Sequence, residues 1–229
     1  MDYSRQLGAD RRLRWRTAYD QYRYRDIFIY DGEAEQEVGV SDVRDSNWGD
    51  WLTTRLSIGT PVGRLGTLTA GSEVYQELRN LQVLFQTTPS AQEFLRVGQP
   101  NRGFAIFAQQ EVPVSKRWKI YAGLRQDYSR NFQWFTAPRL SAVFDQNDRL
   151  AYKLSYARAF RNPSTYEKYY EDEYYQVRNL NLHQERTHAF EASLERRFGK
   201  QVNAIFNTFH YRMKRSEERR VGKECRSRW

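Results

Sequence analysis

The segment from Arg161 to Arg178 carries the side chains of this chain that are best suited to binding chemistry. It holds five tyrosines among four acidic residues, with an arginine at each end. Tyrosine and arginine offer large, rigid contact surfaces together with hydrogen-bond donors. We therefore expect a loop whose ligand-binding residues are Arg161, Tyr166, Tyr169, Tyr170, Tyr174, Tyr175 and Arg178. The alternative is a surface loop that packs on itself, or the edge of an aromatic belt.

Residue patterns for catalysis or metal binding are weak. The three histidines, His183, His188 and His210, lack metal-ligand spacing. There is no G-x-S-x-G motif and no glycine-rich phosphate loop. The acidic pair Glu191 and Glu195 falls on one face of an extended pattern, where the lining of a watery interior explains it better than acid–base chemistry. We expect no enzyme activity, no metal site and no cofactor.

The segment Arg11–Arg25 interleaves cations with aromatic residues, as nucleic-acid-binding surfaces do. At a period of two, however, Arg12, Arg14 and Arg16 lie opposite Leu13, Trp15 and Thr17. This layout favours a strand with one basic face. We therefore expect no nucleic-acid partner.

The elements that must position these residues are strands with one apolar and one polar face. The apolar positions of two segments are Leu150, Tyr152, Leu154 and Tyr156, and Phe190, Ala192 and Leu194, each alternating with polar or small residues. In a membrane barrel the apolar face meets lipid and the polar face lines the lumen. A soluble antiparallel sheet gives the same alternation, because one face packs on a core.

The connections between strands alternate between short and long. Short turns are expected at Gly59–Gly63, Pro113–Lys116, Asp145–Asp148 and Phe198–Lys200. Long loops are expected at Asp31–Gly49, Gln86–Arg102, Arg130–Thr136 and Asn162–Glu185. Outer-membrane barrels have short periplasmic turns and longer extracellular loops, whereas a soluble sandwich has no reason to keep its loops long on one side.

Composition leaves two classes of protein open. Aromatic residues form 15% of the chain, and their amphipathic rings suit a membrane interface, although they also favour any β-sheet. No apolar run is long enough for a transmembrane helix, which needs about 20 residues. The mean hydropathy of −0.89 keeps a soluble protein in consideration.

The two ends of the chain do not fit the strand pattern. The last residues, Arg215–Trp229, lose the alternation and resemble an in-frame translation of a common sequencing adapter, so we interpret 215–229 as an artefactual tail. Residues after Met1 do not form a signal peptide. We expect the natural protein to extend beyond 1–214 at both ends.

Three ordered segments resemble the barrel of TonB-dependent outer-membrane receptors. They are Gly103–Arg130, Pro138–Pro163 and Asn179–Phe198. The matching residues are Gln110, Glu111, Gly123, Leu124, Arg125 and Asp127, then Pro138, Tyr156, Phe160, Arg161 and Pro163, then Asn179, Leu182, Glu185, Phe190, Glu191 and Glu195. The chain departs from the family pattern at Leu180 and Gln184, where prolines are usual, and at Ser193, where glycine is.

The resemblance implies an all-β fold, an antiparallel meander that forms part of a transmembrane barrel, with about nine of about 22 strands. Residues 1–214 would be a partial barrel in the outer membrane, in contact with lipid. The family's plug domain, through which TonB acts, is not found here. The implied function is active uptake of a scarce nutrient, such as a ferric siderophore, haem, cobalamin or an oligosaccharide. The alternatives are a soluble all-β carbohydrate- or nucleic-acid-binding module, and a TonB-independent outer-membrane barrel.

Overall fold

The computed structural model describes residues 1–8, 10–31, 40–171, 177–199 and 201–214. Its strands are β1 (Asp2–Leu7), β2 (Arg11–Asp31), β3 (Val40–Pro61), β4 (Thr67–Thr88), β5 (Gln92–Gly98), β6 (Arg102–Pro113), β7 (Trp118–Ser129), β8 (Gln133–Asn147), β9 (Leu150–Arg161), β10 (Glu185–Phe198) and β11 (Val202–Lys214). A 3₁₀ turn, η1 (Gly63–Leu65), and one helix, α1 (Thr165–Tyr169), complete the described elements. Among these residues no helix has the length and apolar character needed to cross a membrane.

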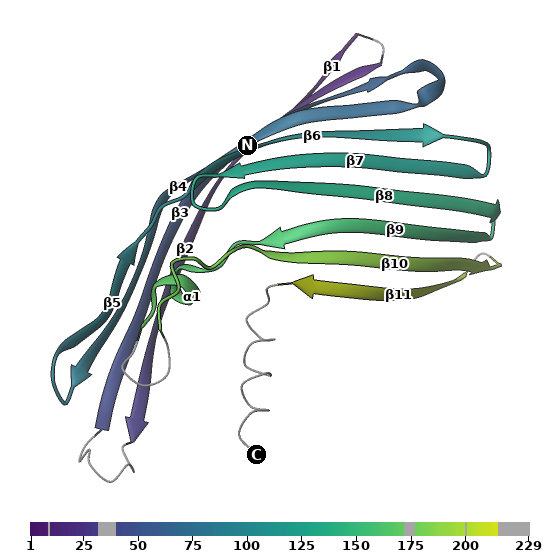
Figure 1. Ribbon diagram of the computed structural model, residues 1–229. Coiled ribbons are helices and arrows are strands. Elements are labelled where there is room, and N and C mark those ends of the chain that lie inside the picture. Colours follow the sequence, from purple (N-terminus) through teal and green to yellow (C-terminus); the bar gives the residue numbers. More distant parts are fainter. Residues whose placement is uncertain (9, 32–39, 172–176, 200, 215–229) are drawn as a thin grey trace.

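The described strands form one curved antiparallel sheet in which neighbours in the sequence pair with each other (Figure 1). The order is β1-β2-β3-β4-β6-β7-β8-β9-β10-β11, and β5 pairs with the far end of β4. The predicted antiparallel meander is therefore confirmed. The sheet has 11 strands rather than about nine, because β1 and β5 were not anticipated. In β5 the sequence QEFLRVG has no clear alternation and resembles a loop.

The first long connection is shorter than expected, because β3 begins at Val40. The prediction of a loop over Asp31–Gly49 is thus wrong for residues 40–49, and that over Gln86–Arg102 is wrong where β5 forms. The prediction of a long loop over Arg130–Thr136 is wrong for residues 133–136, because β8 begins at Gln133. The first part of β3, residues 40–49, which lies at the long-loop end of the sheet, reads VSDVRDSNWG, with polar residues on both faces. Alternation identifies a strand only where one face is apolar, so it could not reveal this part of β3.

The pairing register sorts the side chains into two faces. Tyr152 lies opposite Leu194, and Leu154 opposite Ala192, so the apolar positions of β9 and β10 share one face. The same face continues onto β8 and β7, where Leu154 pairs with Ala142 and Ala142 with Ile120. These side chains are open to the surroundings, with Leu154 63% exposed.

The opposite face is polar, and it is the face that the sheet curves around. The connection that contains α1 crosses the inside of this curve from β9 towards β3 and β4 (Figure 1). There Tyr169 and Tyr170 pack against Val43, Leu84 and Leu95, which form the only cluster of buried apolar residues found within the described residues. The predicted apolar face, with Leu150, Tyr152, Leu154, Phe190 and Leu194, is therefore the convex one.

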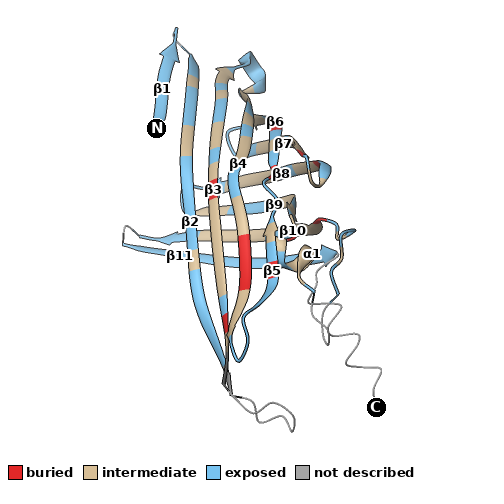
Figure 2. Ribbon diagram, turned by 90° about the vertical axis from the view of Figure 1, so that its left-hand side faces the viewer, coloured by how far each residue is buried: buried red, intermediate tan, exposed pale blue. Residues whose placement is uncertain are grey.

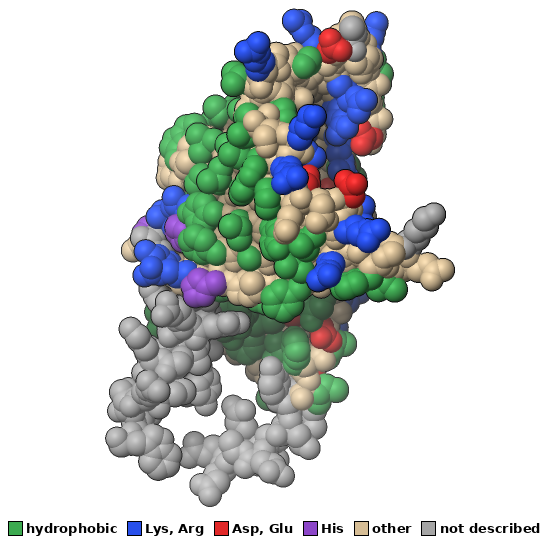
Figure 3. Space-filling view, turned by 90° about the vertical axis from the view of Figure 1, so that its right-hand side faces the viewer, with side chains coloured by type: hydrophobic (Ala, Val, Ile, Leu, Met, Phe, Trp, Pro, Cys, Tyr) green, Lys and Arg blue, Asp and Glu red, His purple; other side chains and the backbone are tan. Residues whose placement is uncertain are grey.

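Exposure follows this single-layer construction. Within the described part of the chain no large side chain is fully buried. Buried residues are most frequent in β3, β4 and β5, and others lie in β6, β7, β8 and the connections, whereas β1, β2 and β11 are largely exposed (Figure 2). Figure 3 shows hydrophobic side chains gathered in one area of the surface, with lysines and arginines beside it.

Two aromatic clusters mark the two ends of the convex face. Near the long-loop end, the ring centroid of Tyr128 lies 5.0 Å from that of Trp134 and 5.5 Å from that of Phe104. Near the short-turn end, the rings of Trp118 and Phe144 stack with centroids 4.7 Å apart. Ten residues of β7 separate Trp118 from Tyr128, about 33 Å along the strand. With a tilt of about 40°, this corresponds to about 25 Å across, the height of the apolar band of an outer-membrane barrel.

The sheet ends in β1 and β11, each of which pairs with a single neighbour among the described strands. The tail, Arg215–Trp229, lies outside the described residues. Its interpretation as an artefact stays a prediction.

Candidate ligand-binding site

The β9–β10 connection begins with a short capped helix. The Ser164 side chain accepts a hydrogen bond from the backbone N–H of Glu167 at 3.2 Å, and the Glu167 carboxylate accepts one from the Ser164 N–H at 2.7 Å. This reciprocal pair is a capping box, and it satisfies two backbone donors that the helix itself cannot. It explains why a five-residue helix forms at this point.

An arginine at the end of β9 fixes this helix to the sheet. The guanidinium of Arg161 donates to both carboxylate oxygens of Glu167, at 2.7 and 3.0 Å, and to Glu185 on β10 at 2.8 Å. Partial burial opposes ionisation of Glu167, but the hydrogen bonds from Arg161 and Ser164 outweigh it and lower the pKa of this carboxyl. Arg161, predicted to bind ligand, is therefore engaged in holding the loop.

The tyrosines of the loop divide into two roles. Tyr166 and Tyr170 stack on each other with ring centroids 4.5 Å apart. Tyr169 and Tyr170 pack on the buried cluster, and Tyr169 also lines the pocket described below. Tyr174 and Tyr175 lie outside the described residues.

Arg178 pairs with Glu171 at 3.1 Å on the exposed part of the loop. The structure thus brings Tyr169 to a pocket and uses Arg161 to secure the loop. Ligand contact by the seven predicted residues stays a prediction.

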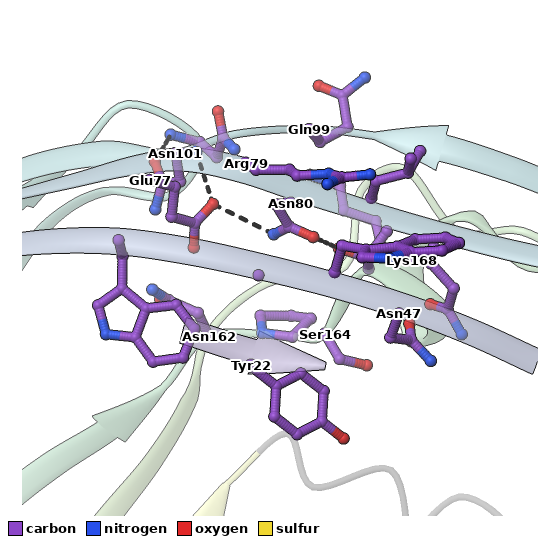
Figure 4. Close-up of a pocket in the computed structure, with 18 of the residues that line it drawn as sticks. Tyr22, Asn47, Glu77, Arg79, Asn80, Gln99, Asn101, Asn162, Ser164 and Lys168 are labelled. Atoms are coloured by element: carbon purple, nitrogen blue, oxygen red, sulfur yellow. Dashed lines mark hydrogen bonds between the residues drawn. The ribbon is translucent and has the colours of Figure 1, made fainter. Parts of the chain in front are cut away.

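The loop closes one side of a pocket of about 500 Å³ on the concave face (Figure 4). The other walls come from the long-loop ends of β2, β3 and β4 and from the β7–β8 connection. Its lining is dominated by side-chain amides and aromatic rings. The amides are Asn47, Asn80, Gln82, Gln99, Asn101, Asn131 and Asn162, and the aromatic residues are Tyr22, Trp48, Trp51, Tyr75, Phe132 and Tyr169.

One carboxylate organises the floor of this pocket. Glu77 accepts hydrogen bonds from the Tyr75 hydroxyl, from Asn80 Nδ2 at 3.1 Å and from the backbone N–H of Asn101 at 2.6 Å. Asn80 in turn accepts from Thr165 Oγ1 at 3.2 Å. The loop is therefore tied to β4 by a polar contact, and the single acidic side chain of the lining is already used.

A glycine lets an aromatic ring lie flat in the pocket. A Cβ at Gly49 would come within 2.9 Å of the Trp51 ring and 3.5 Å of Tyr22. Because Gly49 has no side chain, the Trp51 indole occupies this space beside Tyr22. Any other residue at position 49 would push the ring away.

The sequence alone does not predict the pocket residues of β3 and β4. Asn47 and Gly49 lie in a segment where a loop is expected, and Asn80 and Gln82 follow an irregularity at Leu78, where the β4 register shifts relative to β3. Amides in the part of β3 that is polar on both faces carry no periodic signal, and the shift at Leu78 decides which face Asn80 and Gln82 occupy. The run of Asn and Gln near the expected loops was the only available indication.

Metal ligation is not suggested by the described residues, which contain no group of three or more His, Cys, Asp or Glu side chains placed to hold an ion. Lysine and arginine contribute little free charge to the pocket. Lys168 Nζ lies 5.1 Å from the centre of the Phe132 ring, and the Arg79 guanidinium lies 5.1 Å from that of Trp48. Such cation–π contacts partly occupy both cations.

Comparison with known proteins agrees with this architecture. Residues 2–215 match the family model described as "TonB dependent receptor-like, beta-barrel". No match was found among curated protein sequences.

Solved structures of similar fold include two receptors and one outer membrane transporter. A mutant of the ferric enterobactin receptor PfeA from Pseudomonas aeruginosa has 16% identity and a TM-score of 0.59, over 92% of this chain and 41% of that one. The siderophore receptor PirA from the same species has 21% identity and a TM-score of 0.54, over 92% and 44%. The outer membrane transporter YddB from Escherichia coli has 13% identity and a TM-score of 0.55, over 92% and 33%.

At these identities the likeness concerns the fold alone, and the present chain spans about two fifths of the length of the PfeA structure. The family match, which covers almost the whole sequence, and the convex apolar band together place the chain in the outer membrane. The chain belongs to the TonB-dependent receptor β-barrel family.

Proposed function

We propose that this chain is the ligand-capturing part of an outer-membrane receptor that takes up a scarce nutrient, such as a ferric siderophore, haem, cobalamin or an oligosaccharide. The observation that carries the proposal is the pocket on the concave face. It lies at the long-loop end of the sheet, beyond the aromatic cluster of Phe104, Tyr128 and Trp134. A nutrient arriving from outside would reach it before it entered the lumen.

The wall below the pocket suits passage of a polar solute. On the concave face of β7, Arg125 pairs with Asp127 at 2.8 Å and with Glu73 of β4 at 2.8 Å. Paired charges of this kind keep a lumen hydrated without leaving an isolated charge. The convex face, by contrast, would be covered by outer-membrane lipid.

The basic segment of β2 also fits this arrangement. Arg16 lies opposite Arg55 in the β2–β3 register, and Arg55 stacks on the Phe107 ring with 4.3 Å between guanidinium carbon and ring centre. These side chains are on the polar face, which supports a role in lining the lumen and no role in binding nucleic acid. Energy would come from TonB, acting through a plug domain elsewhere in the full-length receptor, and no catalytic step would be needed.

The test is an uptake assay with the full-length receptor that contains this chain. It would be expressed in a host that lacks its own receptors, with and without TonB. Radiolabelled ferric enterobactin, haem, cyanocobalamin and maltohexaose would be supplied separately. We expect one of them to accumulate only in the presence of TonB.

A pocket variant and a matched control sharpen this assay. Trp51→Ala removes an aromatic wall of the pocket, whereas Trp118→Phe keeps an aromatic ring on the convex face. We expect uptake to fall in the first variant and not in the second. Equal uptake with and without TonB would contradict the proposal.

A further inference from the structure

A side-chain amide lies nearly buried in the wall of the pocket. Gln82 lines the pocket and is only 7% exposed. A ligand atom that covers this amide displaces water from it, and the loss is offset only if the ligand supplies a hydrogen bond in return. Gln82 therefore favours a ligand with hydrogen-bonding groups.

The charges of the pocket are already engaged. Glu77 accepts from three donors, Arg79 lies over Trp48, and Lys168 lies between Phe132 and Tyr169. Arg79 and Trp48 lie on the opposite face of the strands from Gly49 and Asn80, so among the described lining residues the charged side chains that face the pocket are Glu77 and Lys168, with a net charge of zero. A ligand with several negative charges would need more free cations than this to offset the loss of its hydration.

The remaining groups suit neutral hydroxyls. The lining amides of Gln82, Gln99 and Asn131 each offer a donor and an acceptor, which matches a hydroxyl that does the same. The amides of Asn47, Asn80, Asn101 and Asn162 already hydrogen-bond within the protein. The flat faces of Tyr22 and Trp51 suit the apolar face of a sugar ring, and a few polar groups among aromatic walls are typical of small-molecule sites. Gly49 has a role here, because it leaves room for the Trp51 ring beside Tyr22.

We propose that this pocket binds an uncharged, hydroxyl-rich ligand of the oligosaccharide class rather than an anionic metal chelate. The inference rests on the proposed function, because it names the class of nutrient that the receptor captures. Gln82 hydrogen-bonds the sugar hydroxyls, and Trp51 with Tyr22 supports the ring.

Calorimetric titration of the purified full-length receptor in detergent tests this inference. The uncharged probes are maltohexaose, cellohexaose, xylohexaose and chitohexaose, and the others are ferric enterobactin, haem and cyanocobalamin. We expect one oligosaccharide to bind, with an affinity that changes less than about twofold between about 0.05 and about 0.5 M sodium chloride, because no charge pair forms.

Two variants and one control locate the binding. Gln82→Leu keeps the volume but removes the hydrogen bonds, and Gly49→Ala displaces Trp51. Each should weaken the oligosaccharide at least about tenfold, since a site built for a hydroxyl depends on its polar partner and on its fit. Gly59 lies on the same strand and face as Gly49, and a Cβ there would make an ordinary 3.7 Å contact with Thr69 Oγ1. The control variant Gly59→Ala should therefore leave the affinity unchanged.

Three results would overturn the inference. One is binding of ferric enterobactin, haem or cyanocobalamin that Gln82→Leu weakens, which would leave the proposed uptake function intact. Another is the failure of all four oligosaccharides to bind a receptor that shows the mobility of a folded barrel in unheated gels. The third is unchanged oligosaccharide affinity in both Gln82→Leu and Gly49→Ala.

Discussion

The strands β2–β4 and the strands β6–β11 belong to the same sheet but differ in length. Strands β2, β3 and β4 contain 21 or 22 residues each, whereas strands β6 to β11 contain 12 to 15. A strand crosses a bilayer with about 9–11 residues. The short strands therefore end close to the membrane, whereas the long strands continue about ten residues, or about 33 Å, beyond it.

The difference in length separates two tasks. In the shorter strands one face is apolar and the other polar along most of their length, as a membrane wall requires. In residues 40–49 of β3 both faces carry polar residues, and the concave face of β3 and β4 holds the amides of the pocket. The short strands bring the β9–β10 connection to this wall. The pocket exists because one set of strands is long and a loop from the other set folds back against it.

The largest expected effect comes from placing a charge on the membrane wall. Leu140 lies on the convex face, 51% exposed, and Ser141 is its neighbour on the concave face. Leu140→Arg should lower the free energy of unfolding in lipid bilayers by about 2–4 kcal/mol, as charges do at the lipid-facing midplane. Ser141→Arg should lower it by less than about 1 kcal/mol, because its side chain meets water in the lumen. Denaturant titration of the full-length receptor in vesicles measures both, and equal losses would mean that the faces are assigned wrongly.

A smaller effect is expected at the contact between the two sets of strands. Arg161→Ala removes the ion pairs that fix α1, which are partly exposed. The local opening free energy of the segment 162–171 should fall by about 1 kcal/mol, the usual upper range for exposed pairs in a network. Hydrogen exchange of the α1 amides should accelerate accordingly. Arg178→Ala, which removes only the exposed pair with Glu171, serves as the control and should leave exchange at α1 unchanged.

The smallest effect is the pH dependence of the same contact. The pKa of Glu167 is lowered in the folded loop, so its contribution to stability is complete above its ordinary pKa and is lost as pH falls through the lowered value. Exchange at α1 should therefore rise only below about pH 4.3. It should rise less than in Arg161→Ala, because Glu185 still pairs with Arg161. Glu167→Gln should remove this acid response, and a response that begins near neutral pH would point to another group.

The sequence was sufficient for the part of the fold that lies in the membrane. Leu150, Leu154 and Phe190 alternate with polar residues because lipid and water lie on opposite sides of one layer, and this contrast makes the strands visible in a sequence. It was insufficient for residues 40–49, where water surrounds both faces and the pattern vanishes.

The candidate site shows the same limit. The loop from Arg161 to Arg178 was recognised from its composition, but the ion pairs that engage Arg161 depend on the register of β9 with β10. Gln82 faces the pocket only because β4 carries an extra residue at Leu78 relative to β3, and such an irregularity has no periodic signature.

The central claim is that β3 passes from lipid into water. In the membrane its convex face meets lipid and its concave face meets the lumen, and at residues 40–49 both faces meet water. Spin labels on single cysteines along β3 test this claim directly in bilayers, in a full-length receptor from which any other cysteines have been removed. Labels at Leu56 and Ser46 share the convex face, and a label at Ser57 lies on the concave face. We predict that the Leu56 label is accessible to oxygen but not to a water-soluble nickel chelate, and that the labels at Ser57 and Ser46 are accessible to the chelate. A water-accessible label at Leu56, or a lipid-protected one at Ser46, would contradict the account.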